Sequence, residues 1–184
     1  MIHSRSLRAF AAAMAVLALT GFGCSKTRTF TEDGVTYKTT GNLDEENGTG
    51  TATFTNEDGT TGTIEVRGAG ERPPEGFPKN FPIMRGMEAL NYTSLNQDGG
   101  ELYGGEWSTK ASIGDVYAYY KKELPQNDWT VTSTSSYNDS SFIGFSKKGD
   151  QRYAGTVSME KEADGNTKVT MSLMFVTDLS GLGQ

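Results

Sequence analysis

The chain has 184 residues and a formal net charge of −6 at pH 7. An acidic surface repels phosphate backbones, so we expect no nucleic-acid partner. The single histidine is His3 and the single cysteine is Cys24. The chain beyond them lacks the side chains for Ser-His-Asp or Cys-His catalysis, for a His-ligated zinc site and for disulfide bonds, and we expect no metal or cofactor.

Residues 1–23 predict an export signal. Arg5 and Arg8 precede an apolar run at 9–19, and the segment ends on the small residue Gly23. This is the layout of a secretory signal peptide. The apolar run is shorter than the roughly 20 residues that a membrane-spanning helix needs.

The end of this segment resembles the lipobox of bacterial lipoproteins. Gly23, Cys24 and Ser25 match that pattern, while Gly21 and Phe22 replace the Leu and the small residue that are usual in the family. The resemblance implies cleavage between Gly23 and Cys24, a diacylglycerol on the thiol and an acyl chain such as palmitate on the new amino group. Two or more such chains anchor a protein stably. The alternative is an ordinary small-x-small cleavage site and a secreted protein with a free thiol.

A lipid on Cys24 implies that the protein is held by the membrane at the bacterial cell envelope. The resemblance implies the outer membrane, facing the periplasm, because Ser25 is similar to the sorting signal of enteric bacteria. In a Gram-positive host the same anchor implies the outer face of the cell membrane.

Residues 24–67 are the expected lipid-anchored N-terminal segment, and they are rich in threonine. Alternating polar and apolar positions around the turns at Asp33-Gly34 and Asp58-Gly59 predict a small β-meander. The segment has too few apolar residues to bury a core alone, so we expect it to lean on the next domain or to be loosely held.

Residues 68–82 form a linker or strap that is rich in Pro and Gly and contains four of the five prolines. Proline favours extended backbone and does not donate to a strand ladder. Phe77 and Phe81 are unusual in a free linker, and we expect them to pin this segment onto the domain that follows.

Residues 83–176 predict an α+β domain. Two strands come first, then a helix that begins after the N-cap Ser112 and is ended by Pro125 and the polar run to Asp128, and four alternating strands follow. The order is ββαββββ, an antiparallel β-sheet with one helix packed on one face. Gly104-Gly105 predicts a bulge or a close approach in the second strand, and residues 177–184 are expected to be a flexible tail.

Several motifs of this region resemble small bacterial envelope lipoproteins of unknown function, which supports the fold and implies nothing catalytic. The motifs are Phe77-Pro78, Phe81-Pro82-Ile83, Val116-x-x-Tyr119-Tyr120-Lys121 and Trp129-x-Val131.

Successive strand residues face opposite sides, so the last four strands present two different faces. We expect an apolar set to point at the helix: Trp129, Val131, Ile143, Phe145, Val157, Met159, Val169, Met171 and Leu173. We expect a hydroxyl set to point away from it: Thr130, Thr132, Thr156, Ser158, Thr170 and Ser172. Candidate binding residues are Thr132, Thr156 and Thr170 on that open face and Tyr119, which lies off the apolar face of the helix.

The first functional hypothesis is a non-catalytic lipid-anchored protein that binds or scaffolds another envelope component, either a protein or a glycan. The alternative is a carrier of a lipid or other apolar ligand between helix and sheet. It needs a hollow where these side chains meet: Tyr117, Tyr120, Trp129, Phe145 and Met171. A third hypothesis is a carboxylate-based glycan hydrolase, which needs a facing pair of acids such as Asp139 and Asp150.

Lipidation of Cys24 is directly testable. Metabolic labelling with a fatty acid should mark the wild-type protein and leave Cys24→Ala unlabelled, because the thiol is the attachment point. Equal labelling of both proteins, or no label on the wild type, contradicts the lipid anchor.

Overall fold

The computed structural model describes the backbone of residues 26–32, 35–44, 49–55, 59–97, 100–137 and 139–176, and side chains from residue 49 onward. The predicted signal, its junction at Gly23 and Cys24 and the tail at 177–184 lie outside the described residues.

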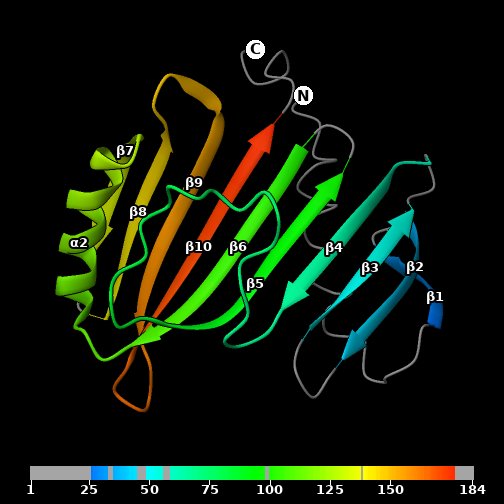
Figure 1. The fold of residues 1–184 in the computed structure, drawn as a ribbon, viewed down its shortest axis with the longest axis horizontal. Coiled ribbons are helices and arrows are strands. Elements are labelled where there is room, and N and C mark those ends of the chain that lie inside the picture. Colours follow the sequence, from blue (N-terminus) through cyan, green and yellow to red (C-terminus); the bar gives the residue numbers. More distant parts are fainter. Residues whose placement is uncertain are drawn as a thin grey trace.

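Ten antiparallel strands form one sheet in the order β1-β2-β3-β4-β5-β6-β10-β9-β8-β7 (Figure 1). The predicted antiparallel sheet with a helix on one face is therefore present. The strands are β1 (Lys26–Glu32), β2 (Val35–Asp44), β3 (Thr49–Thr55), β4 (Thr61–Arg67), β5 (Glu88–Gln97), β6 (Gly100–Thr109), β7 (Trp129–Ser136), β8 (Ser140–Lys147), β9 (Asp150–Lys161) and β10 (Thr167–Val176).

The described helix, α2 (Ile113–Gln126), connects β6 to β7. It begins after Ser112, whose Oγ accepts a hydrogen bond from the Asp115 N–H at 3.2 Å, as expected for an N-cap. Pro125 lies inside its last turn, and the helix continues one residue further before the C-cap Asn127. The helix has 14 residues and is neither long nor apolar enough to cross a membrane, and no other described helix is.

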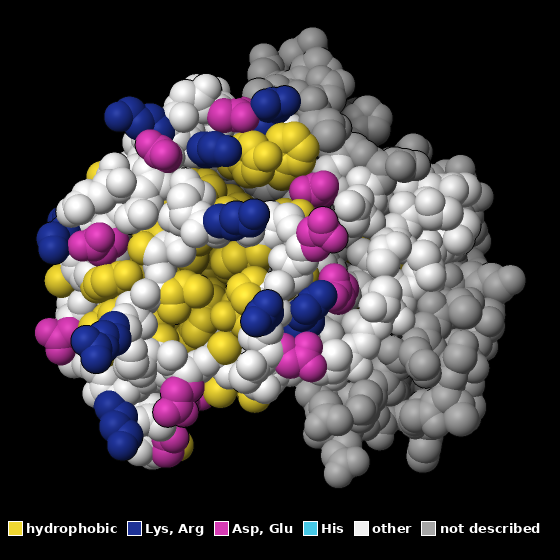
Figure 2. All heavy atoms as spheres, in the orientation of Figure 1, with side chains coloured by type: hydrophobic (Ala, Val, Ile, Leu, Met, Phe, Trp, Pro, Cys, Tyr) yellow, Lys and Arg dark blue, Asp and Glu magenta, His cyan; other side chains and the backbone are white. Residues whose placement is uncertain are grey.

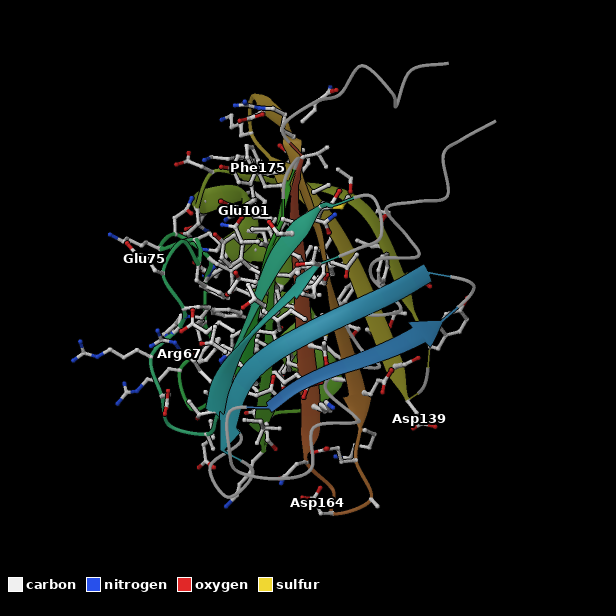
Figure 3. The ribbon with its side chains drawn as sticks, turned by 90° about the vertical axis from the view of Figure 1, so that its right-hand side faces the viewer. Arg67, Glu75, Glu101, Asp139, Asp164 and Phe175 are labelled. Carbon is white, nitrogen blue, oxygen red and sulfur yellow. The ribbon has the colours of Figure 1, made fainter. Side chains whose placement is uncertain are left out.

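α2 lies over β7, β8 and β9. The connection from β4 to β5, residues 68–87, crosses the same face over the middle of the sheet, and we call it the strap (Figures 1 and 3). Helix and strap together therefore cover one side of the sheet, which twists so that β1 and β2 run at a steep angle to β10 (Figure 3).

The main core lies between the sheet and this helix-and-strap layer. The predicted apolar set lies here: its members are buried, except Val131, which is partly buried and packs against the same core. α2 contributes Val116, Tyr120 and Leu124, each with 0% of its surface exposed. The two strap phenylalanines, Phe77 and Phe81, are also part of this core, which agrees with the role predicted for them.

A second, smaller core couples the Thr-rich strands to the rest of the sheet. β4 pairs with β5, and in register Ile64 lies opposite Leu95, which lies opposite Leu102 of β6. Phe54 of β3 packs on the same group. Leu95 is three residues from Tyr92 of the main core, so this cluster lies on the other face of the sheet.

Replacement of Ile64 tests whether this coupling stabilises the whole protein. Ile64→Ala should lower the free energy of unfolding by about 2–5 kcal/mol, the usual cost of such a truncation in a core. Urea unfolding followed by tryptophan fluorescence should register the loss, because both tryptophans lie in the main core. The exposed Thr51→Ala should change stability by no more than about 0.5 kcal/mol. An unchanged tryptophan transition in Ile64→Ala would show that the N-terminal strands unfold separately.

Candidate ligand-binding site

Phe81 of the strap stands at the centre of an aromatic cluster between α2 and the sheet. Its ring is stacked on Trp107 of β6, with 6.3 Å between centroids and an interplanar angle of 17°. The centroid distances to Tyr120, Phe145 and Trp129 are 5.8 Å, 5.7 Å and 6.5 Å. One strap side chain therefore touches the helix and three different strands.

Two further contacts fix the strap beside Phe81. Phe77 packs edge-on against Tyr92 of β5, with ring centroids 5.5 Å apart. Asn80 donates its Nδ2 hydrogen to the Asn127 carbonyl at 2.8 Å and accepts a hydrogen bond at its own carbonyl from Trp129 Nε1 at 3.4 Å. Burial of each Phe contributes about 1.5–3 kcal/mol, so these side chains are the main attachment of the strap.

The backbone–backbone hydrogen bonds of the strap do not reach the sheet. They join residues three apart within the strap, such as Phe77 N–H to Pro74 and Phe81 N–H to Pro78. The prolines have no N–H to offer to a strand ladder. Side chains rather than ladder hydrogen bonds therefore hold this segment against the core.

One buried polar group of the core lacks a partner. Trp107 is 1% exposed, and its Nε1 hydrogen has no acceptor among the described residues. The comparable groups nearby are paired: Trp129 Nε1 with Asn80, Thr167 Oγ1 with the Ala111 carbonyl at 2.8 Å, and Tyr120 Oη with Met87 Sδ at 3.8 Å. A buried donor without a partner costs about 1–3 kcal/mol.

Gly105 lets the Trp107 indole lie against the sheet. A Cβ atom at position 105 would collide with the six-membered ring of Trp107. The sequence predicted either a bulge or a close approach at Gly104-Gly105, and the structure shows a close approach of the Trp107 ring to Gly105. The bulge of this strand pair lies elsewhere, between Ala89 and Asn91 of β5.

The hollow needed by a carrier is filled in this structure. Tyr120, Trp129, Phe145 and Met171 have 0%, 2%, 1% and 1% of their surfaces exposed. A void able to hold a water molecule would leave part of these side chains accessible. Tyr117, the fifth residue of the expected hollow, is partly buried at its edge. A ligand can enter this space only if something that now occupies it moves.

Tyr119 lies at the rim of the same site. Its ring packs edge-on against Tyr120, with centroids 5.3 Å apart. Burial, with a smaller effect of the Glu123 carboxylate, raises the pKa of Tyr119 above its usual value. Met84 and Met87 of the strap are also partly buried against the core. Figure 2 shows apolar side chains gathered on this face with charged side chains around them.

The other three candidate residues, Thr132, Thr156 and Thr170, are not part of this site. Thr132 is exposed, and Thr156 and Thr170 are half-buried. Alternation along β9 and β10 places Thr156 and Thr170 on the opposite face. Thr132 lies at a β-bulge between Val131 and Ser133, where the alternation of β7 is interrupted. Thr132 Oγ1 approaches Gly144, which pairs in register with Thr156. The β9 and β10 members of the hydroxyl set are paired in register, Thr156 with Ser172 and Ser158 with Thr170.

The structure adds a polar depression that the sequence did not predict, because it depends on where the strap lies. It has a volume of about 370 Å³ and opens over β3, β4, β5 and β6 beside the strap. Tyr103 lines it and donates its hydroxyl hydrogen to Glu101 at 2.8 Å. Other lining residues include Thr51, Thr61, Thr63, Glu65 and Glu75.

Asp139 and Asp150 do not form the facing pair that a glycan hydrolase needs. Asp139 and Asp150 lie at opposite ends of β8, about 25 Å apart at the usual rise along a strand. Arg152 binds both oxygens of Asp150 and lowers its pKa to about 2, so this acid stays ionised. The described residues also contain no group of three or more metal-ligating side chains.

Residues 90–165 are similar to a family described as START domain-like. The matched segment runs from β5 through α2 to the turn after β9, so it contains the helix and most of the strands that enclose the aromatic cluster. The strap lies outside it. No curated protein and no solved structure matches the chain.

Burial of Tyr120 predicts a specific pH dependence. Burial raises the pKa of the Tyr120 hydroxyl in the folded protein. In the unfolded chain the same hydroxyl has the ordinary tyrosine pKa of about 10. Above that pH the unfolded state loses a proton that the folded state keeps, so stability falls as pH rises. Tyr120→Phe should remove this contribution, which is about 1.4 kcal/mol per pH unit.

Urea unfolding between pH 9 and pH 11 measures this slope. Tyr137→Phe is the control, because Tyr137 is 74% exposed and should leave the wild-type slope unchanged. The same slope in Tyr120→Phe as in wild type would contradict the assignment.

Proposed function

We propose that this protein is a non-catalytic domain that binds a lipid or other apolar ligand between α2 and the sheet. The observation that carries the proposal is the coincidence of the aromatic cluster around Phe81 with the START domain-like segment. Such a family suggests a fold for lipids or other apolar ligands. Sites for such ligands are lined mainly by hydrophobic and aromatic side chains with a few polar groups.

The chemistry of this space favours binding over catalysis. Its walls are aromatic and aliphatic side chains from α2, the strap and the sheet. The core that lines it consists of hydrophobic and aromatic side chains, and some charged groups outside it form ion pairs, such as Glu106 with Lys168 at 2.9 Å and Glu65 with Arg67 at 2.6 Å. An apolar molecule would meet complementary surface here and no reactive group.

An anchor on Cys24 would place this binding domain beside its ligand source. Under this proposal the protein is a lipoprotein of the bacterial envelope, held by a diacylglycerol at the outer membrane or at the outer face of the cell membrane. A domain tethered at a membrane surface meets lipids at high local concentration, which raises the occupancy of even a weak site.

A second candidate function is the scaffolding of another envelope protein or a glycan through the hydroxyl-rich face. It is favoured by the accessibility of that face, where Thr130 and Thr132 are exposed and Met174 is 41% exposed. Lysine at Thr132, Thr156 and Thr170 should abolish crosslinks to a partner in cells if this face docks one.

Dye binding tests the first proposal. Diphenylhexatriene, which fluoresces in apolar surroundings, should bind the purified protein saturably at a single site. The triple variant with lysine at Thr132, Thr156 and Thr170 is the matched control. Its affinity should stay within about twofold of wild type, because none of the three side chains belongs to the main core.

Two results would contradict this proposal. Absence of saturable dye binding would remove the ligand-binding function. Loss of dye binding in the triple lysine variant, with the fold retained, would place the dye on the hydroxyl-rich face and favour the second candidate.

A further inference from the structure

We propose that Phe81 occupies the place of the ligand in the unloaded protein, and that the Trp107 N–H binds an oxygen of the molecule that displaces it. The ligand class is then an uncharged apolar molecule with a hydrogen-bond-accepting oxygen, such as an ester or a ketone. This inference rests on the proposed function and specifies how the site opens and what it recognises.

Phe81 has the position expected of an occupant. It contacts Trp107, Tyr120, Trp129 and Phe145, which come from β6, α2, β7 and β8. These four residues belong to the START domain-like segment, whereas Phe81 does not. The helix and sheet thus supply the walls, and a separate part of the chain fills the space between them.

The strap can leave this space without disrupting the sheet. Its backbone hydrogen bonds close turns within the strap, so they survive its displacement. The interactions lost are the side-chain contacts of Phe77, Phe81, Met84 and Met87 with the core. The two hydrogen bonds of Asn80 and the one from Tyr120 to Met87 are lost with them. An apolar ligand would make similar contacts with the aromatic side chains that Phe81 now contacts. Phe81 and the ligand can therefore exchange in the same space.

The unpartnered Trp107 N–H indicates what the ligand carries. An indole N–H is a donor only, so its partner must be an acceptor. Phe81 offers none, although its ring is stacked on the indole with 6.3 Å between centroids. A molecule in the place of Phe81 lies against the same indole and can bring an oxygen to this N–H.

The surroundings exclude a charged acceptor. Phe81 is stacked on the Trp107 indole and Tyr92 packs edge-on against it. Ala89 and Val169 lie opposite Trp107 in register, so these described neighbours are apolar or aromatic. A buried carboxylate or phosphate would lose its hydration without a counter-charge. An ester or ketone oxygen needs a single hydrogen bond, which Trp107 supplies.

Two probes that differ by one oxygen test the inference: 2-tridecanone and tridecane, each competing with diphenylhexatriene for the purified protein. Trp107→Phe should weaken the ketone about tenfold, equivalent to about 1.4 kcal/mol, and leave the alkane within about twofold. Trp129→Phe is the matched control, because it removes the same volume from the same core but a donor that is already paired. It should change both probes by the same factor.

Phe81→Ala tests the exchange. Removal of the internal occupant should strengthen both probes about fivefold or more, because the open site is no longer in competition with the strap. Weaker binding of both probes would show that Phe81 is part of the binding surface and would overturn its role as occupant. If the ratio of ketone affinity to alkane affinity is the same in Trp107→Phe and in wild type, the role of Trp107 is overturned. The proposed function is judged separately, by whether the protein binds the dye.

Nuclear magnetic resonance of the wild-type protein decides the outcome if Trp107→Phe does not fold. The chain has two tryptophans and hence two indole N–H signals, which Trp129→Phe assigns. The ketone should move the Trp107 signal downfield, as a new hydrogen bond does, and the alkane should not. The same response to both probes would overturn the inference.

Discussion

The contact between Phe81 and the aromatic residues of α2 and the sheet is the interaction on which the rest of the structure depends. It holds the strap in place, closes the space between helix and sheet, and leaves the buried Trp107 N–H without an acceptor in the part of the chain that the structure describes. Position and chemistry together distinguish this contact from ordinary core packing. Phe81 lies outside the segment that is similar to the START domain-like family, yet it fills the space between the helix and strands of that segment. Its ring packs against the aromatic side chains there but offers no acceptor to the Trp107 N–H.

The features that follow from local sequence were predictable. Ser112 caps α2, and the alternation of Val169, Met171 and Leu173 places them in the main core, because each depends on residues a few positions apart. The centre of the site was not predictable in the same way. Phe81 was expected to pin the strap, but its partners come from four elements that are remote in sequence. The unpaired state of Trp107 depends on all of them together.

The sheet separates two kinds of surface. The helix-and-strap face is aromatic and closed, while the opposite face carries the β9 and β10 members of the hydroxyl set and, over β3, β4, β5 and β6, a small apolar core. Because β4 pairs with β5, the Thr-rich strands extend the same sheet rather than stand apart from it. A ligand held on one face and a partner held on the other would not compete for the same side chains.

Hydrogen exchange of the strap amides tests the central claim most directly. On saturation with 2-tridecanone, exchange at residues 77–87 should become faster, because displacement of Phe81 lifts the strap off the core and exposes its turns to water. Exchange in β9 and β10 should stay unchanged, since their ladders do not involve the strap. Slower or unchanged exchange at residues 77–87 in the saturated protein would show that ligand and strap bind together, and would contradict the account.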